Sequence, residues 1–267
     1  MKIAILGCGA IASLFGAYLS KTNDVTLIGR DRMMVDRIQK NGILVRELAS
    51  DLHFPIKAVA SGEYDGIADL VIILVSGCST EEVLEANSNI IGDNTYLLSL
   101  QIGAGHAKVM RKFQNADHVL LGTTLHGATI LGLGAVNHST KGLTTIGRYN
   151  GRSEGLEPIA EAFSSAGFEV QLSLNARQAI WAKLLNNSTI SAASAMLQCP
   201  LEYLSINSYA WEIVTGLLRE AIMTAKADGY FFDFDDIEKQ LRTICENSRY
   251  GYTTMYSDVA AGRISEI

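Results

Sequence analysis

Residues near the amino terminus have the types and spacing to hold a phosphate group against the backbone. The segment Gly7-Cys8-Gly9-Ala10-Ile11-Ala12 follows an apolar stretch and precedes a helical pattern. Gly7 permits a tight turn, Gly9 lets the backbone approach a pyrophosphate without a Cβ in between, and Ala12 lets the helix pack close to the strand. The N–H groups of a helix amino terminus are unpaired and carry partial positive charge, so phosphates bind there. The pattern G-x-G-x-x-A, with each residue of the turn a candidate contact, therefore predicts a dinucleotide-binding site.

The end of the second expected strand bears on which dinucleotide binds. An NAD site usually has an acidic residue there, which bonds the ribose hydroxyls. This chain has Ile28-Gly29-Arg30-Asp31-Arg32 instead. An arginine at Arg30 would attract a 2′-phosphate and can stack on adenine. Asp31 is the contrary signal, because its carboxylate could serve a ribose hydroxyl, but on balance Arg30 favours NADP(H).

A single lysine in the second half could donate a proton. Lys183 is the only charged residue between Arg177 and Glu202. On a helix, Lys183, Asn187 and Ser191 fall at i, i+4 and i+8, which makes one polar stripe among apolar neighbours. Partial desolvation lowers the pKa of a lysine toward values useful in general acid catalysis. We interpret Lys183 as a candidate catalytic acid, against the alternative of an ordinary solvated lysine.

The first half of the chain alternates short apolar stretches with helical patterns. We expect strands at 2–6, 25–28, 56–60, 69–75, 95–100 and 119–124, further strands with turns over 126–148, and helices over 11–19, over 33–41 and from 79 onward. The 69–75 stretch is apolar throughout, as buried parallel strands tend to be. Ser79 and Glu82 have the spacing of a capping box. This alternation predicts βαβ units and a mostly parallel sheet.

The second half is helical almost throughout. We expect one helix from about 176 to 197, a second that carries Leu204 to Ala225 and ends at Gly229, and a third that carries Ile237 to Ile244. The acidic cluster Asp233–Asp236 is typical of a helix start rather than of a metal site. The predicted fold class is α/β: an N-terminal Rossmann-type doubly wound sheet in residues 1–170, followed by a mostly α-helical substrate and catalytic domain in residues 171–267.

Composition excludes several other classes of protein. The 267 residues carry a formal net charge of −6, which argues against nonspecific nucleic-acid binding. No apolar stretch reaches the roughly 18 residues that span a bilayer, and we expect no signal peptide. The four cysteines form no C-x-x-C pair, so we expect free thiols, buried or half-buried, without a metal, in a reducing cytoplasm. His126 and His138 lie on expected strands, where a packed or surface histidine is more common than a catalytic one.

Several short motifs are shared with a known enzyme family. They are Gly7-x-Gly9-Ala10, Arg30, Gln101-x-Gly103-x-Gly105, Ile146-Gly147-Arg148, Trp181-x-Lys183-Leu184-x-x-Asn187, and Thr254-Met255-x-x-Asp258 through Gly262-Arg263-x-x-Glu266. With these motifs the sequence resembles the ketopantoate reductases (2-dehydropantoate 2-reductases) over nearly its whole length. The Trp-x-Lys-Leu motif and the C-terminal run are the specific part, because many dehydrogenases share the glycine turn.

The resemblance implies an NADPH-dependent reductase of a 2-oxo acid, in the reaction that converts 2-dehydropantoate to pantoate in the pantothenate pathway. Hydride would pass from NADPH to the ketone carbon while Lys183 protonates the oxygen. Asn187 would orient Lys183 or the substrate. Thr254 would hydrogen-bond the substrate carboxylate, and Glu266 would bond the substrate hydroxyl. The implied partner is a small-molecule 2-oxo acid, with no nucleic acid or membrane, and a homodimer stays open.

Three positions depart from the family pattern. Ile102 stands where the family usually has an asparagine that touches cofactor and substrate, Ser76 where it often has lysine, and Ser191 where it has a second asparagine. By position, Ser76, Ile102 and Gly103 would contact the cofactor, and Ser191 the substrate. Each change removes a polar partner, which weakens discrimination between substrates. The particular 2-oxo acid therefore stays open. The family continues with more helix after Ile267, so we expect the second domain to be short at its C-terminus.

Two further interpretations compete with a ketopantoate reductase-like enzyme. Lys183-Leu184-Leu185-Asn186-Asn187 also resembles the Lys-x-x-Asn-Asn helix of 3-hydroxyacid dehydrogenases. The run from Thr254 to Glu266 matches the reductases better. A cofactor-binding protein with weak or no reductase activity, such as a sensor, is the other alternative, and Ile102 and Ser76 motivate it.

Overall fold

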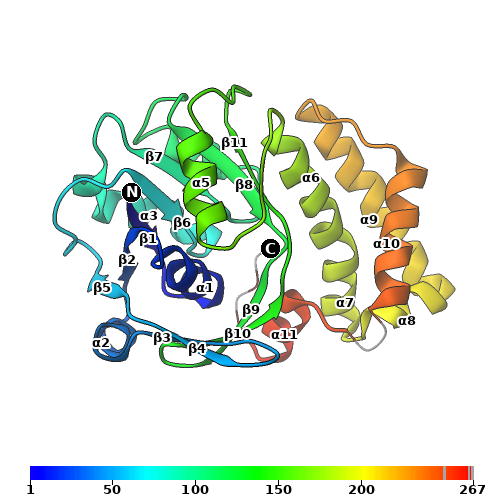
Figure 1. The fold of residues 1–267 in the computed structure, drawn as a ribbon. Helices are drawn as coiled ribbons and strands as arrows, with labels where there is room; N and C mark the ends of the chain where they lie inside the picture. Colours follow the sequence, from blue (N-terminus) through cyan, green and yellow to red (C-terminus); the bar gives the residue numbers. More distant parts are fainter. Residues whose placement is uncertain (249–250, 264, 266–267) are drawn as a thin grey trace. The chain divides into compact units, whose positions relative to one another are not determined.

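The chain forms two compact units, Met1–Ala179 and Ile180–Ile267. The computed structural model describes residues 1–248, 251–263 and 265. The first unit contains both sheets of Figure 1, and the described residues of the second form helices and the turns between them. Helix α6 (Ala176–Asn186) begins in the first unit and ends in the second.

An eight-stranded sheet forms the centre of the first unit. Its strand order is β12-β11-β8-β7-β6-β1-β2-β5. The strands are β1 (Lys2–Leu6), β2 (Asp24–Gly29), β5 (Lys57–Ala60), β6 (Leu70–Ile73), β7 (Tyr96–Ser99), β8 (Val119–Thr124), β11 (Thr144–Arg148) and β12 (Val170–Leu172). All neighbours run parallel except β8 and β11, which are antiparallel. The expected Rossmann-type, mostly parallel sheet is therefore confirmed.

Helices and short turns connect these strands. They are α1 (Ala10–Leu19), α2 (Arg32–Asn41), η1 (Gly77–Ser79), α3 (Thr80–Ala86), η2 (Ser88–Ile90), α4 (His106–Met110) and α5 (Glu157–Ser165). Helix α3 starts where the sequence predicts, but the expected capping box does not form: Ser79 makes no side-chain cap. Instead the hydroxyl of Thr80 donates to the carbonyl of Gly77 at 2.9 Å. The amide of Ser79 donates to the carbonyl of Ser76 at 2.9 Å rather than to the Glu82 carboxylate.

Strand β1 fixes the place where the glycine turn emerges. Ile3 to Leu6 are fully buried, as expected for a central parallel strand. Ile5 is in register with Leu27 of β2 on one side and Ile72 of β6 on the other. Since β1, β2, β6 and β7 run parallel, the loops that follow them meet at one edge of the sheet.

A second, four-stranded sheet was not expected from the sequence. Its order is β4-β3-β10-β9, with β3 (Ile43–Arg46), β4 (Asp51–Phe54), β9 (Gly127–Gly132) and β10 (Ala135–Thr140). Helix α1 packs against β9 and β10. The stretch 126–148, read as further strands, is thus divided between two sheets. Strand β4 has the sequence DLHF, whose mixture of charge and apolar residues gives little strand signal.

The second unit is a set of packed helices. They are the end of α6, the π-helical turn η3 (Asn187–Ser191), α7 (Ala192–Leu197), α8 (Leu201–Ile206), α9 (Ser208–Ala227), α10 (Phe234–Asn247) and α11 (Thr254–Ala260). The expected second helix is split between α8 and α9, because the side chain of Asn207 caps α9 at the amides of Tyr209 and Ala210. Asp233 caps α10 through the amide of Asp236, as the acidic cluster predicts. No helix among the described residues is long and apolar enough to cross a membrane.

Candidate active site

The turn after β1 is shaped by two glycines with different roles. Gly7 has φ +124°, and a Cβ there would lie 2.7 Å from the carbonyl oxygen of Leu74. Gly7 is therefore required both by its backbone conformation and by close contact with the loop after β6. A Cβ on Gly9, in contrast, would meet nothing within 4 Å. The space over Gly9 is open on the side where a pyrophosphate would approach.

The amino terminus of α1 is suited to an anion. Gly9 is its N-cap and provides no side-chain hydrogen bond, and the first turn contains no acidic residue. The amides of Ala10, Ile11 and Ala12 precede the first intrahelical bond, from the amide of Ser13 to the carbonyl of Gly9 at 2.8 Å. Unpaired amides and the helix dipole favour phosphate at this point. The residues present therefore fit a dinucleotide pyrophosphate.

Cys8 fills the underside of the turn rather than facing a ligand. Its half-buried Sγ would lie only 2.7 Å from a Cβ on Gly29, so the glycine at the end of β2 makes room for it. Burial, with a smaller effect from the Asp31 carboxylate, raises the pKa of the Cys8 thiol to about 11. Cys8 is therefore a neutral packing group whose backbone forms the turn.

The end of β2 presents Arg30, while Asp31 is engaged elsewhere. The Asp31 carboxylate accepts hydrogen bonds from the amides of Met33 at 2.9 Å and Met34 at 3.4 Å, which caps α2. Arg30 is exposed and lies 3.4 Å from a carboxylate oxygen of Glu82. The residue that favours NADH in the sequence thus has a structural role, and the guanidinium that favours NADPH lies at the surface.

Gln101 joins the loops that follow β6 and β7. Its amide nitrogen donates to the carbonyl of Val75 at 2.7 Å and to the hydroxyl of Thr80 at 3.0 Å. Its amide oxygen accepts from the hydroxyl of Ser99 at 3.0 Å. Since Gln101 is buried, these bonds hold both loops in place at the edge where the cofactor is expected.

Ile102 and Gly103 continue this loop. The carbonyl of Ile102 is 3.0 Å from Nε2 of the buried His106. Gly103 has φ +140°, and a Cβ there would lie 2.6 Å from the same imidazole nitrogen. The loop therefore presents its backbone at a fixed position, while the half-buried Ile102 side chain offers only apolar contact where the family has an amide.

Ser76 and Cys78 lie on the loop after β6, and both are exposed. The Ser76 hydroxyl is 3.1 Å from the Cys78 sulfur. This contact, together with Ser79 and the charge of Arg30, lowers the pKa of Cys78. The expectation that all four cysteines would be buried or half-buried is wrong for Cys78, because the loop turns its thiol to solvent.

In the second unit, Trp181 fixes the helix that carries Lys183. The buried indole donates from Nε1 to the Asp228 carboxylate, at the C-cap of α9, over 2.8 Å. Lys183, two residues further along, is half-buried. The Trp-x-Lys spacing thus places an anchored aromatic and a partly desolvated lysine on different faces of one helix.

The polar stripe predicted after Lys183 runs into a π-helical turn. Asn187 opens η3 and Ser191 closes it, and both are half-buried. The hydroxyls of Ser188 and Thr189 donate to the carbonyls of Leu184 and Leu185, at 2.7 and 2.5 Å. A regular i, i+4, i+8 stripe is therefore wrong in detail, because the wider turn changes where Ser191 points. Single π-helical turns inside α-helices often occur at functional sites.

Helix α11 packs against η3 and α7. Thr254, its first residue, is exposed, and the neighbouring Thr253 caps the helix by accepting from the amide of Tyr256 at 3.1 Å. The family-motif residue Asp258 pairs with Arg263 at 2.9 Å. The second unit thus brings the helix of Thr254 to the helix of Asn187 and Ser191. Glu266 lies outside the described residues.

The two histidines form a buried chain with Glu47 in the first unit. Nδ1 of His138 lies 2.7 Å from the Glu47 carboxylate, and its Nε2 lies 2.9 Å from Nδ1 of His126. Tyr18 also donates to Glu47, and Lys141 pairs with it at 2.9 Å. His126 and His138 are packed groups, as the sequence favours.

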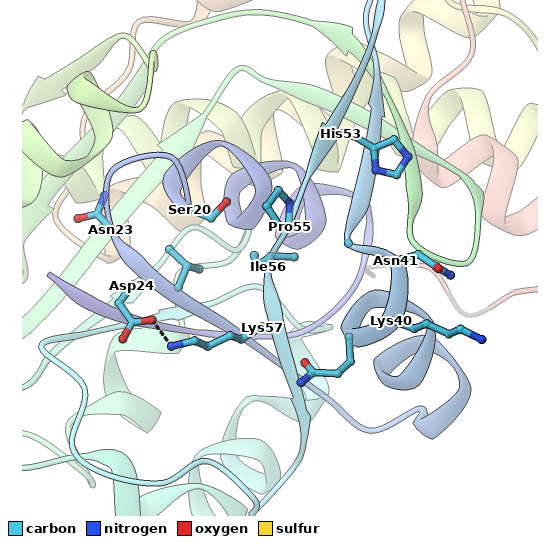
Figure 2. Close-up of a pocket in the computed structure, with 12 residues that line it drawn as sticks. Ser20, Asn23, Asp24, Lys40, Asn41, His53, Pro55, Ile56 and Lys57 are labelled. Carbon is cyan, nitrogen blue, oxygen red and sulfur yellow. Dashed lines mark hydrogen bonds and ion pairs between the residues drawn. The ribbon is translucent and has the colours of Figure 1, made fainter.

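A surface pocket of about 630 Å³ lies at the other edge of the main sheet (Figure 2). It is lined by residues at the starts of β2 and β5 and at the end of α2, among them Asp24, Lys57 and Lys40. Asp24 and Lys57 form an ion pair of 2.7 Å within it. The glycine turn follows the end of β1, which runs parallel to β2, so it lies at the opposite edge of the sheet from the starts of β2 and β5. This pocket is therefore not the dinucleotide site.

The sequence gives no signal for the side-chain contacts of three residues of the site. The roles of Gln101, Glu82 and Asp228 depend on contacts between segments that are 21 to 52 positions apart. Gln101 stands in a motif, but nothing in the motif shows that its side chain joins two loops. The structure places the candidate cofactor residues in the first unit and Lys183, Asn187, Ser191 and Thr254 in the second.

Comparisons with known proteins agree with this architecture. Residues 3–151 match the family model described as "Ketopantoate reductase PanE/ApbA", and residues 175–267 match its C-terminal counterpart. The 2-dehydropantoate 2-reductase of Pyrococcus horikoshii is 33% identical over 270 residues, which cover 100% of this chain and 87% of that protein. That of Halobacterium salinarum is 29% identical, with 100% and 88% covered.

Solved structures are similar over the whole chain. The 2-dehydropantoate 2-reductase of Geobacter metallireducens has a TM-score of 0.91 at 25% identity, covering 100% of this chain and 89% of that one. A D-mandelate dehydrogenase with NADH and anilino(oxo)acetate has a TM-score of 0.91 at 24% identity, covering 100% and 88%. The second likeness concerns the fold alone.

Proposed function

The chain belongs to the ketopantoate reductase family, and from that premise we propose that it reduces a 2-oxo acid with NADPH, with Lys183 as the proton donor. Membership makes the chain an oxidoreductase that acts on a CH–OH/C=O pair and binds a nicotinamide dinucleotide. 2-Dehydropantoate, which gives its name to the relatives, is the first substrate to test. The particular acid, the choice of NADPH and the residue roles are the proposal.

The glycine turn carries the cofactor part of the proposal. Open space over Gly9 and the uncapped start of α1 suit a pyrophosphate. Arg30 supports NADPH over NADH, because a guanidinium can form paired hydrogen bonds to a 2′-phosphate. Asp31 supports the same choice, since its carboxylate caps α2. Ser76, Ile102 and Gly103, on the loops held by Gln101, would contact the nicotinamide half.

Lys183 carries the chemical part. When bound, the cofactor would supply a hydride to the ketone carbon. The carbonyl oxygen gains negative charge as this happens, and an ammonium within hydrogen-bond reach donates its proton to that oxygen. The product is a 2-hydroxy acid, and Lys183 recovers its proton from solvent. Lys183 is half-buried on an anchored helix, which suits a group that must hold one direction.

The remaining residues would bind and orient the substrate. Asn187, one turn after Lys183, would orient the lysine or the substrate. Thr254 would hydrogen-bond the carboxylate, and Ser191 would lie near it, because α11 packs against η3. Glu266 would bond the hydroxyl. Ile102 and Ser191 offer fewer polar partners than the family's asparagines, so we expect broader acceptance of 2-oxo acids.

A substrate panel with a lysine variant tests the proposal. Ketopantoate and other 2-oxo acids are assayed with NADPH and with NADH. Lys183→Ala should lower kcat by about 10²- to 10⁴-fold, the usual contribution of a positioned acid, while the Kd for NADPH stays within about twofold. Lys226→Ala, an exposed lysine of α9 in the same unit, is the matched control and should keep full activity.

Three outcomes would contradict parts of the proposal. Full activity in Lys183→Ala would remove the lysine from the mechanism. Turnover of 3-hydroxy acids but of no 2-oxo acid would favour the 3-hydroxyacid dehydrogenase class. Tight NADPH binding without turnover of any acid would favour a cofactor-binding protein, for which Ile102 and Ser76 give the motive.

A further inference from the structure

A carboxylate lies beside the arginine that would bind the 2′-phosphate. A guanidinium nitrogen of Arg30 is 3.4 Å from a carboxylate oxygen of Glu82, and 64% and 71% of the two side chains are exposed. Glu82 belongs to the first turn of α3, which follows β6, whereas Arg30 follows β2. The contact therefore brings a negative charge from another loop to the place where the adenosine end of a dinucleotide lies.

The position of Glu82 is determined by the packing of α3. Thr80, two residues earlier, is buried and bonds to the amide of Gln101 and the carbonyl of Gly77. Val83, the next residue, is buried as well. Because no capping box forms, the Glu82 side chain extends toward Arg30 rather than toward the helix start. The carboxylate is thus held near the guanidinium by a fixed helix turn.

Arg32 and Asp31, which flank this ion pair in the sequence, are engaged with other groups. Arg32 makes two bonds to Glu63, at 2.9 and 2.5 Å. Asp31 caps α2. The carboxylates of Glu82, Glu63 and Asp31 therefore accompany the two arginines of this corner, and the charge of Asp36 also acts on Arg32. A 2′-phosphate that approaches Arg30 must displace Glu82 and remain near its negative charge, whereas the neutral 2′-hydroxyl of NADH meets neither obstacle.

We propose that Glu82 is a specificity-determining residue, which limits the preference for NADPH over NADH by competing with the 2′-phosphate for Arg30. This inference rests on the proposed function. An exposed ion pair is weak, so NADPH displaces Glu82 and still binds. The result is an enzyme that uses NADPH with a modest preference rather than an exclusive one.

The test measures the Kd of NADPH and of NADH by titration of cofactor fluorescence, with Glu82→Gln and Glu81→Gln variants of the full chain. Glu81 is the matched control, because it lies in the same first turn of α3 but pairs with Lys112. Glu82→Gln should lower the Kd of NADPH by about three- to tenfold at low salt, and this gain should shrink at high salt. The Kd of NADH should stay within about twofold, and Glu81→Gln should change neither.

The outcomes separate the two proposals. The role of Glu82 would be overturned if Glu82→Gln left the Kd of NADPH unchanged or changed the Kd of both cofactors equally. It would also be overturned if Glu81→Gln had the same effect as Glu82→Gln. In each case the wild type would still bind NADPH. Failure of the wild type to bind either cofactor would overturn both. Arg30→Met gives a second readout: it should weaken NADPH more than NADH, and the gain from Glu82→Gln should be smaller in that background.

Discussion

The indole nitrogen of Trp181 donates a 2.8 Å hydrogen bond to the carboxylate of Asp228. This bond ties α6, two residues before Lys183, to the end of α9. We expect Trp181→Phe to lose about 1–3 kcal/mol of unfolding free energy, since a hydrogen bond to a charged group disappears. We also expect kcat to fall about tenfold, because a less well oriented Lys183 would raise the activation free energy, and about 1.4 kcal/mol corresponds to that factor.

Trp211 provides the control for this prediction. Its indole nitrogen donates to the Glu238 carboxylate at 2.7 Å, and this bond joins α9 to α10 in the same unit. Trp211→Phe should lower stability to urea by a similar amount and leave kcat unchanged. Equal losses of kcat in the two variants would show that Trp181 supports only the fold and does not position Lys183.

Gln101 should matter for cofactor affinity. Its replacement by alanine leaves the half-buried Val75 carbonyl and the buried Thr80 hydroxyl without this partner and frees two loops to move. We expect the Kd of NADPH to rise by about tenfold or more, within the range of 1–3 kcal/mol for lost buried hydrogen bonds. The measurement is fluorescence titration beside thermal unfolding.

A matched glutamine exists at the other end of β7. The Gln114 amide donates to the carbonyls of Gly92 and Thr95, both at 3.0 Å. Gln114→Ala should therefore cost similar stability but leave the Kd of NADPH within about twofold. Equal weakening of NADPH binding by both variants would mean that Gln101 contributes only general stability.

Periodicity predicted the elements that are buried and regular. Strand β1 begins and ends at Lys2 and Leu6, as expected, because a continuous apolar stretch is what a central parallel strand requires. The turn Gly7–Ala12 was also predictable, since its chemistry is local. The candidate lysine was visible because Lys183 is isolated among apolar neighbours.

Features that depend on tertiary contacts could not be predicted. Strand β3 pairs with β4 on one side and with β10 on the other, and the short sequences of β3 (ILVR) and β4 (DLHF) lack a strong alternation of polar and apolar residues. The expected capping box at Ser79 did not form, since Thr80 bonds to Gly77 and Glu82 meets Arg30. The π-helical turn after Lys183 could not be predicted, because its residues show the same helical periodicity as an ordinary α-helix.

Cys78 should be the thiol that reacts in the native protein. It is exposed, and its pKa is lowered by the contact with Ser76, whereas burial raises the pKa of Cys199 and, to about 12, that of Cys245. A lower pKa gives Cys78 more of the reactive thiolate, and its exposure lets an alkylating reagent reach the sulfur. We expect one fast thiol per chain near neutral pH, and this fast phase should disappear in Cys78→Ser.

Saturating NADPH should slow this alkylation several-fold, because the loop of Ser76 and Cys78 is expected to contact the cofactor. The rate is followed by mass spectrometry of the labelled peptide with and without NADPH. An unchanged rate at saturation would place the cofactor away from this loop and contradict the assignment of Ser76.

The chain of Glu47, His138 and His126 should make stability depend on pH. Burial, then the nearby charges of His138 and Lys141, lowers the pKa of His126 from 6.5 to about 4. Burial alone would raise the pKa of Glu47, but hydrogen bonds from Tyr18, His138 and Lys141 hold it at about 2. Nδ1 of His138 lies 2.7 Å from the Glu47 carboxylate, and Nε2 of His138 lies 2.9 Å from Nδ1 of His126.

The sign follows from the protons bound in each state. Between pH 6.5 and 4 the unfolded chain protonates His126 and the folded chain does not, so the free energy of unfolding falls as the pH is lowered through this range. The contribution of Glu47 to the free energy of unfolding is fully present above pH 4.5 and is lost as the pH falls toward 2. Urea unfolding at a series of pH values measures both slopes.

His126→Asn separates the histidine from the carboxylate. The variant lacks the group that titrates between pH 6.5 and 4, so its free energy of unfolding should vary less over that range than that of the wild type. Below pH 4.5 the two proteins should lose stability with similar slopes, since Glu47 is still bonded by Tyr18, His138 and Lys141. If the free energy of unfolding of both proteins had the same slope between pH 6.5 and 4, His126 would be charged in the folded protein. Its Nε2, which has no hydrogen-bond partner among the described residues, would then be hydrated in solution.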